Sequence, residues 1–205
     1  MVTRAWSPTR TAVAAALAVG FLISAAVVWQ SSRAAFFATT ENHNNQWSAG
    51  TVTLTDNDSN GAMFTALALK PGDGGSACIK VTYGGSLNAS GVKLYVKAGD
   101  HTFTSASSLA PYINLTVEQG DGDVPFDGTC TNFSNPSTIY NGTLGAAVTG
   151  FAVAKTDFAS GVGAWTPAGG SNAYKAYRFT WSLQDDNGAQ GLNCTVKFTW
   201  EAQSA

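Results

Sequence analysis

The residues that could carry out chemistry are few in this chain and lie far apart. The two histidines, His43 and His101, lie far apart in the sequence, and neither belongs to an H-E-x-x-H zinc motif. Serines and aspartates are plentiful, but no G-x-S-x-G motif is present to expose a nucleophile on a sharp turn. The sequence therefore predicts no catalytic residue, no resident metal and no cofactor, and it favours a non-catalytic protein.

One short segment resembles the first half of a calcium-binding loop. Asp56, Asp58 and Asn60 have the spacing of the first three ligands, and a glycine follows directly. The position of the bidentate glutamate that completes such a loop is occupied by Leu67. The same residues are typical of a hairpin turn, because Asp and Asn side chains hydrogen-bond the neighbouring backbone. A turn is the favoured interpretation, with calcium as the alternative.

The N-terminus has the pattern of an export signal. Arginines precede residues 11–28, which are almost entirely apolar or small. Ser32 and Ala34 place small residues at the −3 and −1 positions that signal peptidase requires, so we predict cleavage after Ala34 and a secreted or cell-surface protein without a stable membrane anchor. The alternative is an uncleaved anchor, because the uncharged residues 11–32 are numerous enough to span a bilayer.

The charge of the chain argues against two classes of partner. The chain has 11 basic and 13 acidic residues, and cleavage after Ala34 removes three basic residues and no acidic one, which leaves 8 − 13 = −5. Such a mildly acidic, lysine-poor protein lacks the basic footprint of a nucleic-acid-binding protein and the polybasic patch of a membrane-surface protein. Only 12% of residues are charged, and Thr, Ser, Asn and Gly fill the polar positions.

Apolar and polar residues alternate with a period of two along most of the chain after residue 50, which predicts strands with one buried and one solvated face. Turns rich in Gly, Asp and Asn separate these segments. Ala62 to Leu69 is a weaker strand candidate, and two short helices are expected near 105–110 and 143–148. The alternating segments cover residues 51–55, 79–83, 92–97, 113–118, 177–184 and 194–201.

Many short strands without a helical period predict an all-β fold, a two-sheet, jelly-roll-like sandwich. We expect three parts: a signal peptide at 1–34 that contains a signal helix, an N-terminal extension at 35–49, and a β-sandwich domain at 50–205. A domain of that length can bury a sizeable core and does not need disulfide bonds or a metal ion to fold.

The three cysteines are distinguished by strand parity. Cys194 shares its face with Val196, so we expect it to be a buried free thiol. Cys78 shares its face with Lys80 and should point away from the core, and Cys130 lies in a loop. A surface strand cysteine and a loop cysteine can pair without disturbing the core, so the sequence predicts a Cys78–Cys130 disulfide in an exported protein. Three reduced cysteines are the alternative.

Several short motifs, taken in their order along the chain, resemble the TasA/camelysin family of secreted matrix-fibre proteins of Gram-positive bacteria. Each motif is short, but together they span nearly the whole chain. They are Ala34-Ala-Phe-Phe37 at the cleavage seam, Trp47-Ser-Ala-Gly-Thr-Val-Thr-Leu54, Leu69-Lys-Pro-Gly-Asp73, Gly84-Gly-Ser-Leu87, and Gln190-Gly191 followed by Cys194 to Ala202.

The resemblance implies a jelly-roll domain, export by a dedicated SipW-type signal peptidase, and a homo-oligomer or biofilm-matrix fibre built by donor-strand exchange. In this mode the N-terminal segment of one subunit completes a sheet of the next. The donor would begin at Ala35 and end near Trp47, with Phe36, Phe37 and Trp47 as apolar anchors. Thr39 to Gln46 is almost wholly polar, so the segment either docks at two points or lies on its own domain.

Two other functions stay open at this stage. The family name camelysin carries a metalloendopeptidase activity, which makes a secreted peptidase the first alternative. A module that binds cell-wall components or other matrix carbohydrate is the second, with Trp47, Trp165 and Tyr174 as aromatic residues that could stack on sugars.

Overall fold

The computed structural model describes residues 49–59, 61–102, 108–146 and 148–205, together with four helical positions at 12, 13, 17 and 19. The chain divides into two compact units, Met1–Ser48 and Ala49–Ala205. The expected signal helix, the cleavage residues Ser32 and Ala34, and nearly all of the N-terminal extension lie outside the described residues. No helix in the described part of the chain is long and apolar enough to cross a membrane.

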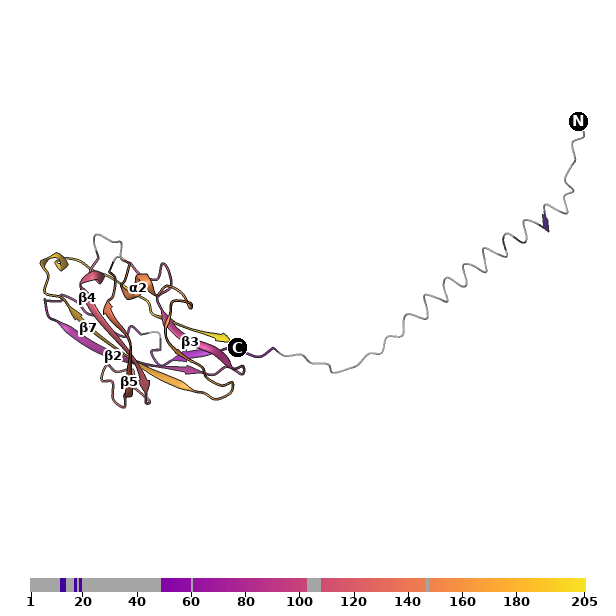
Figure 1. Ribbon diagram of the computed structural model, residues 1–205, viewed down its shortest axis with the longest axis horizontal. Coiled ribbons are helices and arrows are strands. Elements are labelled where there is room, and N and C mark those ends of the chain that lie inside the picture. Colours follow the sequence, from indigo (N-terminus) through magenta and orange to yellow (C-terminus); the bar gives the residue numbers. More distant parts are fainter. Residues whose placement is uncertain are drawn as a thin grey trace, which may run out of the picture. The chain divides into compact units, whose positions relative to one another are not determined.

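The second unit is an all-β sandwich of two antiparallel sheets, as the sequence predicts (Figure 1). One sheet has five strands in the order β1-β2-β7-β4-β5, and the other has three in the order β6-β3-β8. The strands are β1 (Leu54–Asp56), β2 (Gly74–Tyr83), β3 (Ala89–Tyr95), β4 (Ile113–Asp121), β5 (Ser134–Thr143), β6 (Val162–Trp165), β7 (Tyr174–Leu183) and β8 (Thr199–Ser204).

The core lies between the facing sides of the two sheets and is rich in aromatic rings. Tyr177 and Phe179 of β7 are fully buried. The ring of Tyr177 lies 5.3 Å from that of Trp200, and the ring of Phe179 lies 4.6 Å from that of Phe198. These contacts join the five-stranded sheet to the chain of β8, and edge-on aromatic pairs of this kind add to the stabilisation from burial alone. The unit Ala49–Ala205 therefore has its own core and is expected to fold without the preceding residues.

A buried hydrogen-bond cluster fixes one side of this core. The hydroxyl of Tyr177 accepts hydrogen bonds from Gln119 Nε2 at 3.0 Å and Trp165 Nε1 at 3.1 Å. Gln119 Nε2 also donates to the backbone oxygen of Gly163 at 2.6 Å, which ties β4 to β6. Burial raises the pKa of Tyr177 to about 12, so its hydroxyl stays protonated. Trp165 is half-buried in this cluster and is not the exposed sugar-stacking residue that the sequence suggested.

Local pattern alone mispredicts several elements. Strands β5 and β6 are not among the expected strands. Strand β5 has little alternation and contains Pro136, which the fold tolerates because β5 is an edge strand, paired only with β4. Ala62 to Leu69 is not a strand. Among the described residues of the second unit, the helical elements are α2 (Phe151–Ala154) and the 3-10 turns η1 (Ala110–Tyr112) and η2 (Asn187–Ala189). Of the two expected helices, residues 105–107 and 147 lie outside the described residues.

The predicted disulfide is present: Cys78 of β2 is bonded to Cys130, with their Cα atoms 5.1 Å apart. The reasoning behind it needs a correction, because Cys78 is only 1% exposed. It does point away from the main core, but the loop that carries Cys130 folds over this face and buries Cys78 with Val124 and Ala176. Asn57 holds the same loop, since its Nδ2 donates to the oxygen of Val124 at 2.8 Å.

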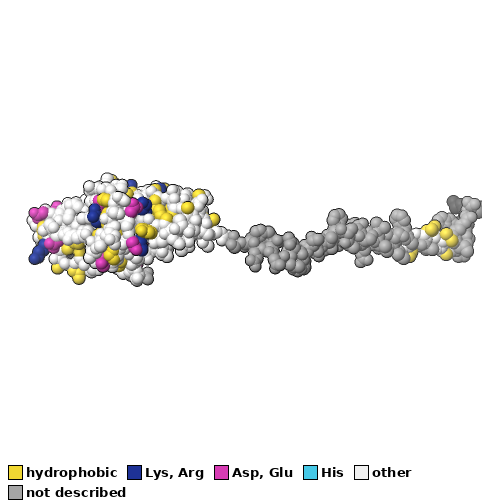
Figure 2. All heavy atoms as spheres, turned by 90° about the horizontal axis from the view of Figure 1, so that it is seen from below, with side chains coloured by type: hydrophobic (Ala, Val, Ile, Leu, Met, Phe, Trp, Pro, Cys, Tyr) yellow, Lys and Arg dark blue, Asp and Glu magenta, His cyan; other side chains and the backbone are white. Residues whose placement is uncertain are grey.

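Two ion pairs join β4 and β7 of the five-stranded sheet. Lys175 forms an ion pair with Asp121 at 2.7 Å, and Arg178 forms one with Glu118 at 2.7 Å. The Lys175 ammonium also lowers the pKa of Asp121 by its hydrogen bond. Positive and negative side chains lie next to one another on the face shown in Figure 2, with no large area of a single sign.

Candidate functional site

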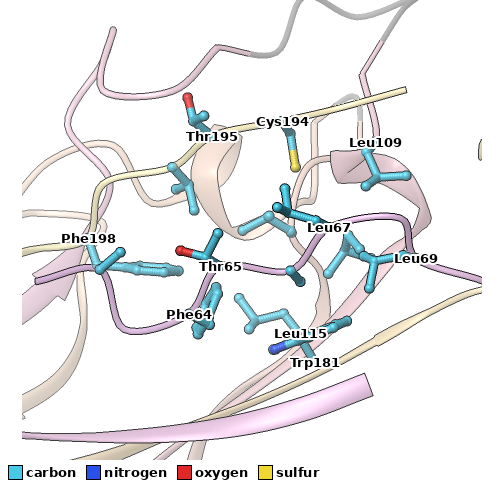
Figure 3. A pocket seen from close by; sticks show the side chains of 15 residues that line it. Phe64, Thr65, Leu67, Leu69, Leu109, Leu115, Trp181, Cys194, Thr195 and Phe198 are labelled. Atoms are coloured by element: carbon cyan, nitrogen blue, oxygen red, sulfur yellow. The ribbon is translucent and has the colours of Figure 1, made fainter. Parts of the chain in front are cut away.

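The most prominent feature of the second unit is an apolar groove at one end of the sandwich (Figure 3). We call this end distal; it is where β2 begins at Gly74. The groove has a volume of about 380 Å³ and is open to solvent. It is lined by Ala62, Phe64, Thr65, Ala66, Leu67, Leu69, Leu109, Ile113, Leu115, Leu144, Trp181, Cys194, Thr195, Val196 and Phe198.

The floor of the groove is the inner face of the five-stranded sheet where β4 begins and β7 ends. Leu115 pairs with Trp181 across these two strands, and Ile113 pairs with Leu183. The three-stranded sheet does not cover these floor residues, because its strand β8 begins only at Thr199. The chain at 194–198 passes above the floor without forming a strand, and only an isolated bridge joins Val196 to His101. The floor is therefore left partly uncovered.

The remaining wall is the segment Ala62–Leu69, which we call the strap. Its Met63, Phe64 and Leu69 are half-buried against the core, and the ring of Phe64 lies 6.3 Å from that of Trp181. In Figure 3 Phe64 points toward Trp181 and Leu115, and Thr65 points toward the opposite wall. Among the described residues, apolar side-chain contacts hold the strap, and no backbone hydrogen bond joins residues 62–69 to any other described residue.

The chain enters the sandwich at the other end, which we call proximal. The backbone N–H of Thr51 donates to Ser86 Oγ at 2.8 Å, and the N–H of Leu87 donates to the oxygen of Thr51 at 3.3 Å. The last residue, Ala205, is held at the same end by its N–H bond to Asn88 at 3.0 Å. In Figure 1 the C-terminus lies at this end, and β2 runs from the distal end to it. The full length of β2 therefore separates the point of entry from the groove.

Cys194 is a free cysteine, as predicted, but it is only half-buried instead of buried. The sequence pattern at 194–200 suggested a core strand, whereas this part of the chain is irregular and Cys194 forms part of the groove wall. Partial burial raises the pKa of its thiol, so the thiol is protonated at neutral pH and is a weak nucleophile. Its contribution to the groove is that of a small apolar side chain.

The calcium candidate forms a turn. The backbone N–H of Asp58 approaches Asp56 Oδ1 at 3.3 Å, and the N–H of Gly61 donates to the oxygen of Asp58 at 2.8 Å. Burial and the neighbouring Asp58 raise the pKa of Asp56. Asn60 lies outside the described residues. Within the part of the chain that the structure describes, no three His, Cys, Asp or Glu side chains cluster closely enough to hold a metal ion.

The residues predicted for self-assembly, Ala35, Phe36, Phe37 and Trp47, lie outside the described residues, so the prediction for them stays a prediction. Sequence reasoning did not find the groove. Its one available signal was the apolar segment 62–69, whose weak alternation is explained by a strap that contacts the core at irregular intervals. Trp181 and Leu115 have the sequence pattern of ordinary core residues. Strand alternation predicts that their side chains point inward, but it does not predict whether another part of the chain covers them.

The groove can bind apolar side chains and presents little for other chemistry. Of its 15 lining residues only Cys194 titrates, and the other polar side-chain groups are the hydroxyls of Thr65 and Thr195 and the indole N–H of Trp181. Thr195 Oγ1 is already hydrogen-bonded to Thr102 Oγ1 at 2.7 Å.

Compared with models of known protein families and with curated proteins, the chain has no significant match. The structure shows an open, apolar groove on an all-β sandwich.

Proposed function

We infer that this protein is a non-catalytic, secreted structural protein whose copies assemble head to tail into extracellular fibres. The N-terminal extension of one copy, residues 35–47, occupies the groove of the next copy as a donor strand. The observation that carries this proposal is the apolar groove left open at the distal end of the sandwich. The resemblance of the sequence motifs to TasA/camelysin proteins points to the same function.

The positions of the groove and of Ala49 support an exchange between copies. The extension leaves the sandwich at the proximal end, where Thr51 is held by Ser86, and the groove lies at the distal end. To reach its own groove the extension would have to reverse direction at Ala49 and run back along β2, a strand of 10 residues or roughly 33 Å. An extension that continues outward meets the distal end of another copy instead.

The chemistry of the extension suits the groove. Phe36 and Phe37 are two adjacent large apolar side chains near the expected new N-terminus, and Trp47 is a third. An exposed pair of phenylalanines is a liability unless a partner buries it, and the groove offers Leu115 and Trp181 as its floor. Main-chain hydrogen bonds of an added strand would supply affinity that does not depend on side-chain type, which accommodates the polar residues 39–46.

A contact of this kind is heterologous, because the donor and the acceptor are different surfaces of the same molecule. Repetition of a heterologous contact that does not close into a ring produces an open filament. The Cys78–Cys130 disulfide is the kind of crosslink that persists outside the cell. The proposal therefore accounts for an export signal, an aromatic extension and an open groove in one chain.

The test compares the chain that begins at Ala35 with one that begins at Gly50, by electron microscopy and light scattering at matched concentrations. Fibres are expected from the first and monomers from the second. The double substitution Phe36→Ser and Phe37→Ser in the longer chain keeps the length of the extension and is expected to prevent fibres as well. Equal fibre formation by all three proteins would rule out the proposal.

A matched pair of substitutions tests the acceptor. Val196→Asp places a charge on the groove wall and is expected to stop assembly, because the carboxylate would be buried by the incoming strand without a partner. Val153→Asp introduces the same charge at an exposed position of α2 that does not line the groove. Circular dichroism of both variants checks that each remains folded. Normal fibres from Val196→Asp would exclude this groove as the acceptor.

A further inference from the structure

The strap Ala62–Leu69 is held among the described residues mainly by a few apolar contacts. Its backbone makes no hydrogen bond to any described residue, although it lies over a sheet. Leu67 is 81% exposed, and Ala68 has a φ of 52°, a backbone conformation that residues with a Cβ rarely adopt. Segments with few backbone hydrogen bonds and exposed apolar side chains open locally at low free energy.

Open space lies on both sides of the strap. The groove borders one side. On the other side a second cavity of about 230 Å³ separates Ala62 and Met63 from Ala77, Cys78 and Phe126. A chain segment between two cavities has lost packing contacts on each of them, so the strap adheres mainly through Phe64 on Trp181 and through Met63 and Leu69.

The second cavity adjoins an incomplete sheet edge. On one side β2 pairs with β7 from Gly74 to Thr82. On its other side β2 pairs with β1 only from Val81 to Tyr83. Just beyond that pairing, the N–H of Lys80 donates to a side chain, Asn57 Oδ1, at 2.8 Å. The edge of β2 from Gly74 to Ile79 therefore has no partner strand among the described residues, and an unpaired edge is a template for an added strand.

We propose that the strap is a displaceable cover of a strand-acceptor site made of the groove and the free edge of β2. In the free subunit the strap shields this site. When the N-terminal extension of a second copy arrives, the strap leaves, and the extension pairs with β2 and fills the groove. This inference rests on the proposed function, because the incoming strand is residues 35–47 of that second copy.

The exchange is favoured by a difference in bonding. The strap contributes a few apolar contacts and no backbone ladder, whereas an added strand contributes the ladder as well as its own apolar anchors. The strap also lowers the apparent affinity of the site, because only the fraction of molecules with the strap open can accept a strand. It thereby covers an edge that would otherwise pair with any extended chain.

Hydrogen exchange measured by mass spectrometry tests the displacement directly on the chain that begins at Ala35. Before assembly, fast exchange is expected in residues 62–69 and also along the edge of β2. In fibres, those amides of residues 74–79 that face the free edge of β2 should become protected while those of 62–69 remain fast. Protection of residues 62–69 in the fibre would show that the strap stays in place, and it would overturn the inference.

Two substitutions give an independent test. Phe64→Ala removes the contact of the strap with Trp181 and should tighten binding of a synthetic peptide of residues 35–47 to the unit Ala49–Ala205 by about fivefold, because more molecules have the strap open. Val153→Ala, at an exposed position of α2 that does not line the groove, should leave the affinity unchanged. Fluorescence anisotropy of a labelled peptide measures both.

The outcomes separate this inference from the proposed function. Peptide binding to the unaltered unit with equal or weaker binding to Phe64→Ala would overturn the displaceable strap and leave the donor-strand function standing. No binding to any of the three proteins, together with no fibres from the chain that begins at Ala35, would overturn both.

Discussion

The two ends of the sandwich are built from similar residues but are closed in different ways. At the proximal end, Tyr83 is fully buried, its hydroxyl donates to the oxygen of Leu87 at 2.6 Å, and backbone bonds join Thr51 to Leu87. At the distal end, Phe64 is half-buried and its strap has no backbone bond to any described residue. One end is completed by directional bonds, and the other is only covered by apolar contacts.

This difference indicates at which end of the sandwich the fold tolerates apolar residues that are not fully covered. The central core, from Ile79 and Val117 to Phe179, is fully buried, whereas Met63, Phe64 and Leu69 of the strap pack against it and are only half-buried. The distal floor can therefore remain partly uncovered at a cost in stability that the rest of the sandwich sustains. The open groove lies at the end of the sandwich that backbone hydrogen bonds of the strap do not close.

The largest expected effect comes from removing the aromatic side chain at each end. Tyr83→Ala should lower the free energy of unfolding by roughly 3–5 kcal/mol, as for other buried aromatic residues, because it leaves a cavity in a closed region. Phe64→Ala should cost clearly less, since its ring is half-exposed and already borders a cavity. Urea denaturation of both variants measures the difference. Equal losses would mean that the two ends are equally closed.

A control variant separates the ring of Tyr83 from its hydroxyl. Tyr83→Phe keeps the buried ring and removes the bond to the oxygen of Leu87. It should cost about 1 kcal/mol, the usual net value of one hydrogen bond. A loss as large as that of Tyr83→Ala would show that the bond, and not the packing, closes the proximal end.

The next largest effect concerns the disulfide beside the free edge of β2. Replacing both Cys78 and Cys130 with alanine opens a loop with a sequence separation of 52 and should destabilise the domain by about 2–5 kcal/mol. Thermal unfolding with and without reductant measures this loss. Cys194→Ala is the matched control and should change stability much less, because Cys194 is unpaired and half-buried. A larger loss from Cys194→Ala would contradict the description of the groove wall.

A smaller effect is expected from adding one methyl group at the proximal end. A Cβ at Gly85 would lie 2.6 Å from both the backbone oxygen of Thr51 and the hydroxyl of Tyr83. Gly85→Ala should therefore cost about 1–3 kcal/mol by overpacking. At the adjacent Gly84 the nearest atom, Asn172 Oδ1, is 3.8 Å away, so Gly84→Ala should be close to neutral. Chemical denaturation that ranks the two variants the other way round would argue against a tightly closed proximal end.

The smallest expected effect is that of pH, which should change the stability of the fold but not binding at the groove. Hydrogen bonds from Tyr95 and Gln203 lower the pKa of Glu201. A carboxyl with a lowered pKa stabilises the fold above its unfolded value, about 4.3 for glutamate, and this stabilisation is lost as the pH falls through the folded value. Stability should thus decline below about pH 4.3, and Tyr95→Phe should reduce the decline.

The pair of Tyr95 and Glu201 should also make stability depend on pH in the alkaline range. The bond to Glu201 raises the pKa of Tyr95 to about 12, so its contribution is present below the unfolded value and is lost as the pH rises through about 12. The groove contains no carboxyl group. Binding of a peptide of residues 35–47 that is acetylated at its N-terminus and carries His43→Gln, so that its own histidine and amine cannot titrate, should therefore be constant between pH 5 and 8, as measured by anisotropy. A strong change in that range would place a titrating group in the acceptor site.

The sequence by itself determined the class of fold and one crosslink. Strand periodicity is a local property, so the alternation along β2, β4 and β7 sufficed to place their inward and outward faces. The pairing of Cys78 with Cys130 also followed from local pattern, since one lies on a strand and the other in a loop. The turn at Asp56 and Asp58 was likewise favoured by the chemistry of its side chains.

Only the tertiary structure decided what covers each face. The loop at 122–133 buries Cys78 on a side that parity marked as solvated, and the edge position of β5 admits a proline that argued against a strand. The strap has an apolar composition similar to that of a strand and still forms no ladder. Whether a segment finds a partner depends on residues distant in the sequence, and for this reason the open groove was invisible until the sheets were assembled.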